Sequence, residues 1–288
     1  MTGMLLLLAA WPAVAAVPVV RITGPEAVVA EVRLQLVERI PEVDVRGDDA
    51  SAELLVAIGA RAFRDAMESS TVPVVGMALT RDSYRAALRE VDAPGRVPHT
   101  ALYWDPDPVR QLQLARTILP AAKRVGIFAG APADQALLAA LRAECARLGF
   151  VPVIAPPPGA GREALPRRLA GVLADSDFLL GIEDGDVFVP ANAKTILLTA
   201  YRHGRPVIGP GGAWVDAGSV ASLTAGLPEA IDALADWLPA LLVTRPLPPP
   251  RYPRHYEVAT NPQVARSLSI QLPPPERLPA PLRQGGTR

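Results

Sequence analysis

The sequence has few of the residues that hold folds together covalently or through metals. It contains a single cysteine, Cys145, which excludes an intramolecular disulfide and a cysteine-based zinc site. Cys145 lies in the helical pattern ALLAALRAECARLGF, where we expect a small buried apolar residue. The three histidines, His99, His203 and His255, are not at metal-ligand spacing from one another or from a carboxylate. We therefore expect no metal and no other cofactor.

Aromatic residues and known catalytic motifs are also scarce. Aromatic side chains make up only 5% of the chain, so the core must consist mainly of Val, Leu, Ile and Ala. The 29 basic and 29 acidic residues cancel, and no basic stripe points to nucleic acid. The sequence has no G-x-S-x-G elbow, P-loop or G-x-G-x-x-G fingerprint. These absences favour a binding protein over an enzyme.

The N-terminus begins with a short apolar run. Residues 4–11 are apolar, and Ala13-Val14-Ala15 fits a small-x-small cleavage site. The run is too short to span a bilayer comfortably, and no cysteine follows it for a lipid anchor. We therefore expect residues 1–16 to be a signal peptide that directs export to a periplasm. The alternative is a short buried strand or a truncated start.

After residue 17 the sequence alternates short β-branched runs with helical patterns. In the first half we expect strands at 17–24, 53–59, 72–79 and 99–104, and helices at 25–40 and 60–69. In the second half we expect strands at 124–130, 151–158, 177–186, 205–212 and 219–223, and helices at 134–150, 163–176, 192–204 and 228–242. Strands that are apolar throughout and separated by helices are typical of parallel sheets covered on both faces.

These two blocks predict an α/β protein with two Rossmann-like lobes. We place the N-terminal lobe at 17–105, the C-terminal lobe at 106–225, a closing helix and return segment at 226–272 and a proline-rich disordered tail at 273–288. In the return segment, Asn261 can cap a helix that has Pro262 at its first position. Because such sheets bind ligands beyond the carboxyl ends of their strands, we expect a cleft between the lobes, with hinges near 104–108 and 224–228.

Three features stand at predicted strand ends. The acidic turn 183–186, Glu-Asp-Gly-Asp, fits a solvated turn, a cleft lining, a cation site or an acid–base pair. The segment 209–214, GPGGAW, is a weak phosphate loop and better fits a loop at the carboxyl edge of a sheet. Tyr103, Trp104 and Trp214 can face a ligand or pack in a hinge or lobe interface.

Four segments occur in an order that is similar to a known family. They are ELLVAIGARAFRDAMESSTVPVVGMAL, YWDPDPVRQLQLARTILPAAKRVGIF, DFLLGIEDGDVFVPANAKTILLTAYRHGRPVIGPGGAWVDAGSVASL and HYEVATNPQVARSLSIQLP, within residues 50–273. In these segments the chain resembles the substrate-binding proteins of ABC transporters, of the tryptophan/tyrosine type, with a type I periplasmic-binding fold. It departs from that pattern in a short first lobe, a more acidic turn, and GPGG where a serine is expected.

The resemblance implies a set of ligand-binding residues. They are Gly59, Ala60, Arg61, Met77, Ala78, Tyr103, Asp105, Asp184, Gly211 and Trp214. In that arrangement the N–H groups near Ala60 hold a ligand carboxylate, and Asp184 holds an amine. Trp214 or Tyr103 stacks on an apolar part of the ligand.

The function that the resemblance implies is that of a periplasmic substrate-binding protein of an ABC-type importer. Lobe closure would trap a small molecule, with an amino acid or a related compound as candidates, and an inner-membrane permease would be the partner. Two alternatives stay open. One is a sensory or accessory binding protein without its own transporter, and the other is an enzyme, such as a nucleotide-sugar transferase, that uses the acidic turn.

Overall fold

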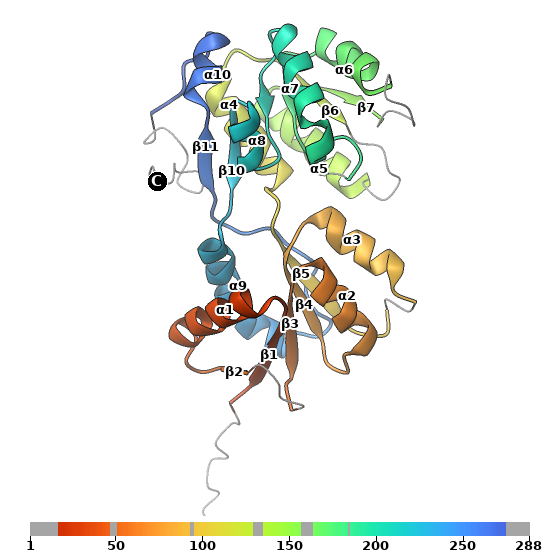
Figure 1. The fold of residues 1–288 in the computed structure, drawn as a ribbon, viewed down its shortest axis with the longest axis vertical. Helices are drawn as coiled ribbons and strands as arrows, with labels where there is room; N and C mark the ends of the chain where they lie inside the picture. The colour runs from red at the N-terminus through yellow and green to blue at the C-terminus, as the bar shows by residue number, and fades with distance from the viewer. Residues whose placement is uncertain are drawn as a thin grey trace, which may run out of the picture.

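The computed structural model describes residues 17–46, 51–92, 95–128, 135–156, 164–183 and 185–274, and these ranges form two lobes (Figure 1). The signal peptide expected at 1–16 and residues 275–288 of the expected tail lie outside the described residues. Among the helices of the described ranges, none has the length and apolar character needed to cross a membrane.

The first lobe is built on a parallel sheet with the strand order β2-β1-β3-β4-β5. Its strands are β1 (Val19–Thr23), β2 (Asp44–Arg46), β3 (Leu54–Ile58), β4 (Val74–Leu79) and β5 (His99–Tyr103). One face packs against α1 (Glu26–Arg39) and α9 (Leu227–Val243), and the other against α2 (Ala60–Ser69) and α3 (Arg81–Glu90). Every residue of β3 is buried, as expected for a central strand covered on both faces.

The second lobe has a sheet with the order β11-β10-β9-β8-β6-β7. Its strands are β6 (Arg124–Phe128), β7 (Val151–Ala155), β8 (Phe178–Leu180), β9 (Val207–Ile208), β10 (Ala221–Thr224) and β11 (Glu257–Thr260). All of these pairs are parallel except β10 with β11, which is antiparallel. The return segment thus supplies the edge strand of this sheet.

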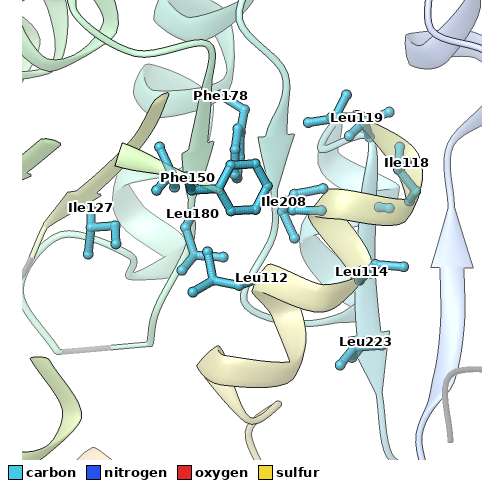
Figure 2. Close-up of a cluster of buried hydrophobic side chains, with 14 of the residues drawn as sticks. Leu112, Leu114, Ile118, Leu119, Ile127, Phe150, Phe178, Leu180, Ile208 and Leu223 are labelled. Atoms are coloured by element: carbon cyan, nitrogen blue, oxygen red, sulfur yellow. The ribbon is translucent and has the colours of Figure 1, made fainter. Parts of the chain in front are cut away.

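Helices cover both faces of the second sheet. On one face α4 (Pro108–Ile118) and α5 (Gln135–Leu148) enclose an apolar cluster around Phe178, which Figure 2 shows. Cys145 is fully buried in this cluster, which confirms the interpretation made from its helical pattern. The other face packs against α6 (Ala164–Ala174), α7 (Ala193–Arg202) and α8 (Gly212–Ala217); the shorter η2 (Pro190–Asn192) and α10 (Pro262–Ser267) complete the lobe.

The chain passes between the lobes three times, because elements that adjoin in sequence belong to different sheets. The crossings are 104–107, between β5 and α4, then 225–226, between β10 and α9, and finally 252–256, which leads to β11. Before the third crossing, Arg251 pairs in parallel with Leu102 of β5. The first two crossings coincide with the expected hinge segments, whereas the third was not predicted.

The fold class expected from the sequence is confirmed, and the differences lie in single elements. The expectation omitted β2, α3, α8 and β11, and it made β8 and β9 too long, because much of 177–186 and 205–212 forms loops at the sheet's carboxyl edge. The capped helix is confirmed: Oδ1 of Asn261 accepts a hydrogen bond from Val264 N at 3.0 Å, with Pro262 at the first helical position.

Candidate functional site

The carboxyl ends of the parallel strands in each lobe point toward the other lobe. β5 ends at the first crossing and β10 ends at the second, and the strands parallel to them share their direction. The loops that follow β3, β4, β8 and β9 therefore border the space between the lobes, as Figure 1 shows. We call these loops and the adjoining crossing 104–107 the inter-lobe face.

Ala78 is the most unusual backbone position on the inter-lobe face. Its φ is 53°, in the left-handed region that residues with a Cβ rarely adopt. The pairing of β4 with β5 shifts between Met77 and Leu79, so Ala78 is the extra residue of a β-bulge. Such a conformation costs about 1–3 kcal/mol and is concentrated at ligand-binding positions. The strain makes Ala78 a candidate contact position, and its contact with a ligand stays a prediction.

Asp105 is a buried carboxyl group in the first crossing. Only 4% of it is exposed, and its Oδ1 accepts a hydrogen bond from Arg81 N, in the first turn of α3, at 2.8 Å. The pKa of Asp105 is raised to about 7, mainly by burial and also by the negative charge of Glu183, which together outweigh the lowering effects of the hydrogen bond from Arg81 N and of the Arg81 charge. Asp105 is therefore poised to change charge near neutral pH while it is held between both lobes.

An aromatic cluster packs beside Asp105. The ring of Tyr103 lies 5.8 Å from that of Tyr84 and 4.9 Å from that of Tyr252, both edge-on. Burial raises the pKa of Tyr103 to about 12, so its hydroxyl stays protonated near neutral pH. The hydroxyl of Tyr252 is buried and has no hydrogen-bond partner among the residues that the structure describes. The cluster thus fixes the first and third crossings to one another with aromatic contacts.

The acidic turn approaches the first lobe closely. Gly185 has a φ of 72°, and a Cβ atom built on it would lie 2.5 Å from Oδ2 of Asp82 in the first turn of α3. The positive φ therefore favours glycine, and a side chain at this position would also force the Asp82 carboxylate to turn aside. Of the predicted site residues, Asp184 lies outside the described residues, whereas its neighbour Glu183 influences the pKa of Asp105 across the lobes.

The Gly-rich loop after β9 leads into α8 and packs inward. Gly211 is the N-cap of α8, with open space where a Cβ would be. Trp214 is 8% exposed, and its ring lies 5.3 Å from that of Phe188. This packing within the second lobe leaves little of the indole surface for a ligand. Gly209 is needed for that packing, because a Cβ there would lie 2.5 Å from Ser219 Oγ.

A buried network of hydrogen bonds fixes the start of the Gly-rich loop against α4. The side chain of Gln111 in α4 donates to Gly209 O at 2.5 Å and to Ser222 Oγ at 3.1 Å. Its Oε1 accepts from Leu223 N at 3.1 Å. One fully enclosed amide therefore joins α4 to the ends of β9 and β10, and this fixes the start of the Gly-rich loop.

The remaining predicted site residues separate into two groups. The Met77 side chain is fully buried in the core of the first lobe, so a ligand can reach only its main chain. The loop after β3 and the start of α2 hold Gly59, Ala60 and Arg61, which line one end of a groove of about 680 Å³ that continues along α2. Gly59 N donates a hydrogen bond to Met77 O at 2.8 Å, so this loop adjoins the end of β4 on the inter-lobe face, where the structure also brings Ala78, Tyr103 and Asp105 together.

Sequence reasoning did not identify three residues that shape the inter-lobe face. Asp82 lies in α3, a helix that was not predicted. Tyr252 lies in a proline-rich stretch, where the aromatic residues of the segment RYPRHY were the only indication of buried packing. Gln111 lies within a helical pattern, where a glutamine does not stand out as a buried polar residue. In the ranges that the structure describes, no group of three or more His, Cys, Asp or Glu side chains is placed to hold a metal ion.

Comparison with known proteins identifies the fold. No protein-family model matches the sequence, and no curated protein matches it. A conserved domain protein from Vibrio cholerae is 18% identical with a TM-score of 0.54, over 88% of this chain and 95% of that one. An ABC domain from Streptococcus pneumonia in complex with L-Trp is 14% identical with a TM-score of 0.54, over the same shares.

A third structure is similar over a larger part of the chain. It is the ligand-free, open structure of a substrate binding protein with adhesive properties from Clostridium difficile. It is 15% identical with a TM-score of 0.61, over 94% of this chain and 99% of that one. At these identities the likeness establishes the fold, and this chain has the type I periplasmic-binding fold.

Proposed function

We propose that this chain is a substrate-binding protein that captures a small molecule at the inter-lobe face. The observation that carries the proposal is the meeting of strained Ala78 and buried Asp105 where the carboxyl ends of the first sheet face the second lobe. The likeness to an ABC domain that holds L-Trp and to an open substrate binding protein supports it. The chain acts by binding and not by catalysis.

Closure of the lobes about the three crossings is the mechanism that we propose. Asp105 is almost fully enclosed, so a ligand reaches its carboxylate only when the lobes separate. A protonated ligand amine would pair with that carboxylate, and the positive charge of the amine would then favour the ionised form of Asp105. The main chain at Ala78 and the ring of Tyr103 would contact the rest of the ligand.

We further propose that the chain works with an ABC permease after export to a periplasm. The apolar residues 4–11 followed by Ala13-Val14-Ala15 support export, and the structural neighbours support the link to transport. In this role the permease would recognise the closed form of the two lobes.

The test begins with the ligand that the protein carries. Compounds released from the purified, denatured chain are identified by mass spectrometry, and each is then titrated by calorimetry, together with L-tryptophan. We expect one compound to bind at a single site, and X-ray scattering to show a smaller radius of gyration with ligand. Asp105→Asn should weaken binding about tenfold, since it removes the charge that pairs with the ligand.

Asp65→Asn is the matched control, because Asp65 is an exposed carboxylate on α2 and should leave affinity unchanged. A chain that carries no compound and shows neither heat nor compaction with L-tryptophan would contradict capture at the inter-lobe face. Equal affinity of Asp105→Asn and the unmodified chain would remove Asp105 from the site.

A further inference from the structure

The outer layer of the second lobe carries charge of one sign, although the acidic and basic residues of the whole chain cancel. α6 and α7 are neighbouring helices that pack against the same face of the sheet (Figure 1). Neither helix contains an aspartate or a glutamate, and residues 187–215 contain none either. The exposed cations of the two helices are Arg167, Arg168, Lys194 and Arg202. We call the solvent side of α6 and α7, with these four residues, the basic face.

The charge of the basic face is not neutralised by the chain. None of its four cations forms an ion pair or a side-chain hydrogen bond within the part of the chain that the structure describes. Other surface cations do pair with acids, as Arg64 of α2 does with Glu90 of α3. The adjoining sequence outside the described ranges adds no net negative charge, because 157–163 has one arginine and one glutamate, and 275–288 has three arginines and one glutamate.

Two large apolar side chains stand exposed among these cations. Leu198 is 45% exposed and Tyr201 is 51% exposed, one turn apart on α7. Lys194 lies one turn before Leu198 on the same side of the helix, and Arg202 directly follows Tyr201. The buried side of α7 is formed by Ile196, Leu197 and Ala200. α7 is therefore apolar toward the core, and toward solvent it is both apolar and basic.

A comparison with α1 shows that this combination is not a general property of the surface. α1 also exposes two large apolar side chains, Leu34 at 61% and Val37 at 48%. However, α1 carries three glutamates and two arginines, whereas α7 carries cations and no acid. A negatively charged surface would therefore be attracted to α7 and not to α1.

Cations around exposed leucine and tyrosine are typical of helices that lie on an anionic lipid bilayer. The charged ends of lysine and arginine stay near the lipid phosphates while their stems cover apolar surface. Tyrosine is favoured at the same depth, because its ring is apolar and its hydroxyl can stay hydrated. Two apolar side chains on the outside of a helix suit shallow entry into a fluid surface, whereas a stable protein interface buries a larger complementary area.

We propose that the basic face binds the surface of an anionic lipid bilayer. Its four cations lie against the lipid phosphates, and Leu198 and Tyr201 enter the boundary between the headgroups and the acyl chains. The basic face covers the side of the second sheet, whereas the inter-lobe face lies at the carboxyl edge of that sheet. Binding to lipid therefore does not depend on the ligand capture proposed above.

The test is cosedimentation of the full chain with two kinds of vesicle, one of phosphatidylglycerol and phosphatidylcholine in equal parts and one of phosphatidylcholine alone. We expect tighter binding to the anionic vesicles, and loss of this preference at about 1 M salt, where the screening length is about 3 Å. Lys194→Gln and Arg202→Gln should each weaken binding to the anionic vesicles about fivefold, because each removes one cation from the lipid surface.

Two control variants match these changes. Arg142→Gln removes an exposed cation from α5, which covers the opposite face of the same sheet, and should leave binding unchanged. Leu198→Gln should weaken binding about threefold or more, since it removes apolar surface that enters the lipid, whereas Leu34→Gln on α1 should have no effect. Thermal melting of each variant shows whether the fold is retained.

The proposal is overturned if the two kinds of vesicle are bound equally well, or if a folded Lys194→Gln variant binds as well as Arg142→Gln does. Equal binding by Leu198→Gln and Leu34→Gln would also overturn it. Attraction through charge alone would then indicate an acidic protein, and not a lipid surface, as the partner of the basic face.

Discussion

The two lobes share an architecture but differ in how completely their sheets are covered. In the second lobe, α4 and α5 cover one face, α6, α7 and α8 cover the other, and the antiparallel β11 closes an edge. In the first lobe, only seven residues join β2 to β3, and the described ranges hold no helix between these two strands. Arg21 of β1 is half-buried there, whereas its register neighbour Leu55 on β3 is buried in the apolar core.

The lobes also contribute differently to the inter-lobe face. The first lobe supplies buried and strained groups, Asp105 and Ala78, whereas the second lobe supplies the acidic turn and a well-packed Gly-rich loop. Strain and an enclosed carboxyl group reduce stability, so the first lobe carries most of that cost. If the chain captures a ligand as proposed, this difference predicts that recognition centres on the first lobe.

The largest expected effect comes from emptying the core of one lobe at a time, which tests whether the two lobes unfold independently. Phe178→Ala and Phe63→Ala each empty a fully buried site, one in each lobe, and should each lower the free energy of unfolding by about 3–5 kcal/mol. Hydrogen exchange measured by mass spectrometry should then speed up mainly in the lobe that carries the change. Equal acceleration in both lobes would show that they unfold as one unit.

The next effect concerns Asp105 and pH. Its pKa is raised to about 7 in the fold, from 3.8 in the unfolded chain, so the folded state holds the proton more tightly. The free energy of unfolding should therefore fall as pH rises from about 4 to 7, by about 4 kcal/mol at most. Urea denaturation across this range should show the fall in the unmodified chain and in Asp65→Asn, and its absence in Asp105→Asn.

A smaller effect concerns the contact between the lobes. Gly185→Ala should cost about 1–2 kcal/mol from its φ of 72° and should also force the Asp82 carboxylate to turn aside. Gly149→Ala is matched, since its φ is also 72° but no atom lies within 4 Å of the added Cβ. Thermal denaturation should show a loss of stability in both variants and a larger loss in Gly185→Ala, and equal losses would speak against the contact.

The smallest effect compares two tyrosines of the third crossing. The hydroxyl of Tyr256 accepts a hydrogen bond from Asp107 N at 3.1 Å, whereas that of Tyr252 is buried and has no partner in the described part of the chain. Tyr256→Phe should lower the free energy of unfolding by about 1 kcal/mol, and Tyr252→Phe should leave it unchanged or raise it slightly. Thermal denaturation measures both, and a larger loss for Tyr252→Phe would indicate a hydrogen bond that forms in solution.

Much of this fold could be predicted from the sequence, because apolar strands such as 53–59 and capped helices carry local signals. α3 escaped prediction because it is short and charged, and only Tyr84 and Ala87 on it are buried. β11 escaped because its partner, β10, lies far away in sequence and no local pattern marks a single edge strand. Prediction thus succeeded where the deciding contacts are local.

The candidate site could be predicted less well than the fold. Ala78, Tyr103 and Asp105 stand at strand ends, which a sequence marks, and the structure brings them together. The unpaired hydroxyl of Tyr252 and the approach of Gly185 to Asp82 depend on contacts between lobes, which a sequence does not show. A tryptophan fits a buried core as well as a ligand pocket, so the sequence does not decide between these roles for Trp214. Only its packing against Phe188 in the structure shows that it belongs to the core.

The crossings also decide the order in which the protein can be completed during synthesis. The first sheet is finished at Tyr103, yet α9, whose Ile231 and Leu234 pack in the same cluster as Val56 of that sheet, is made only after β10 of the second lobe. A nascent chain that stops before α9 has an apolar face on its first sheet and lacks the edge strand of its second. Nearly the whole chain must therefore be synthesised and emerge from the ribosome before either lobe can fold to its final form.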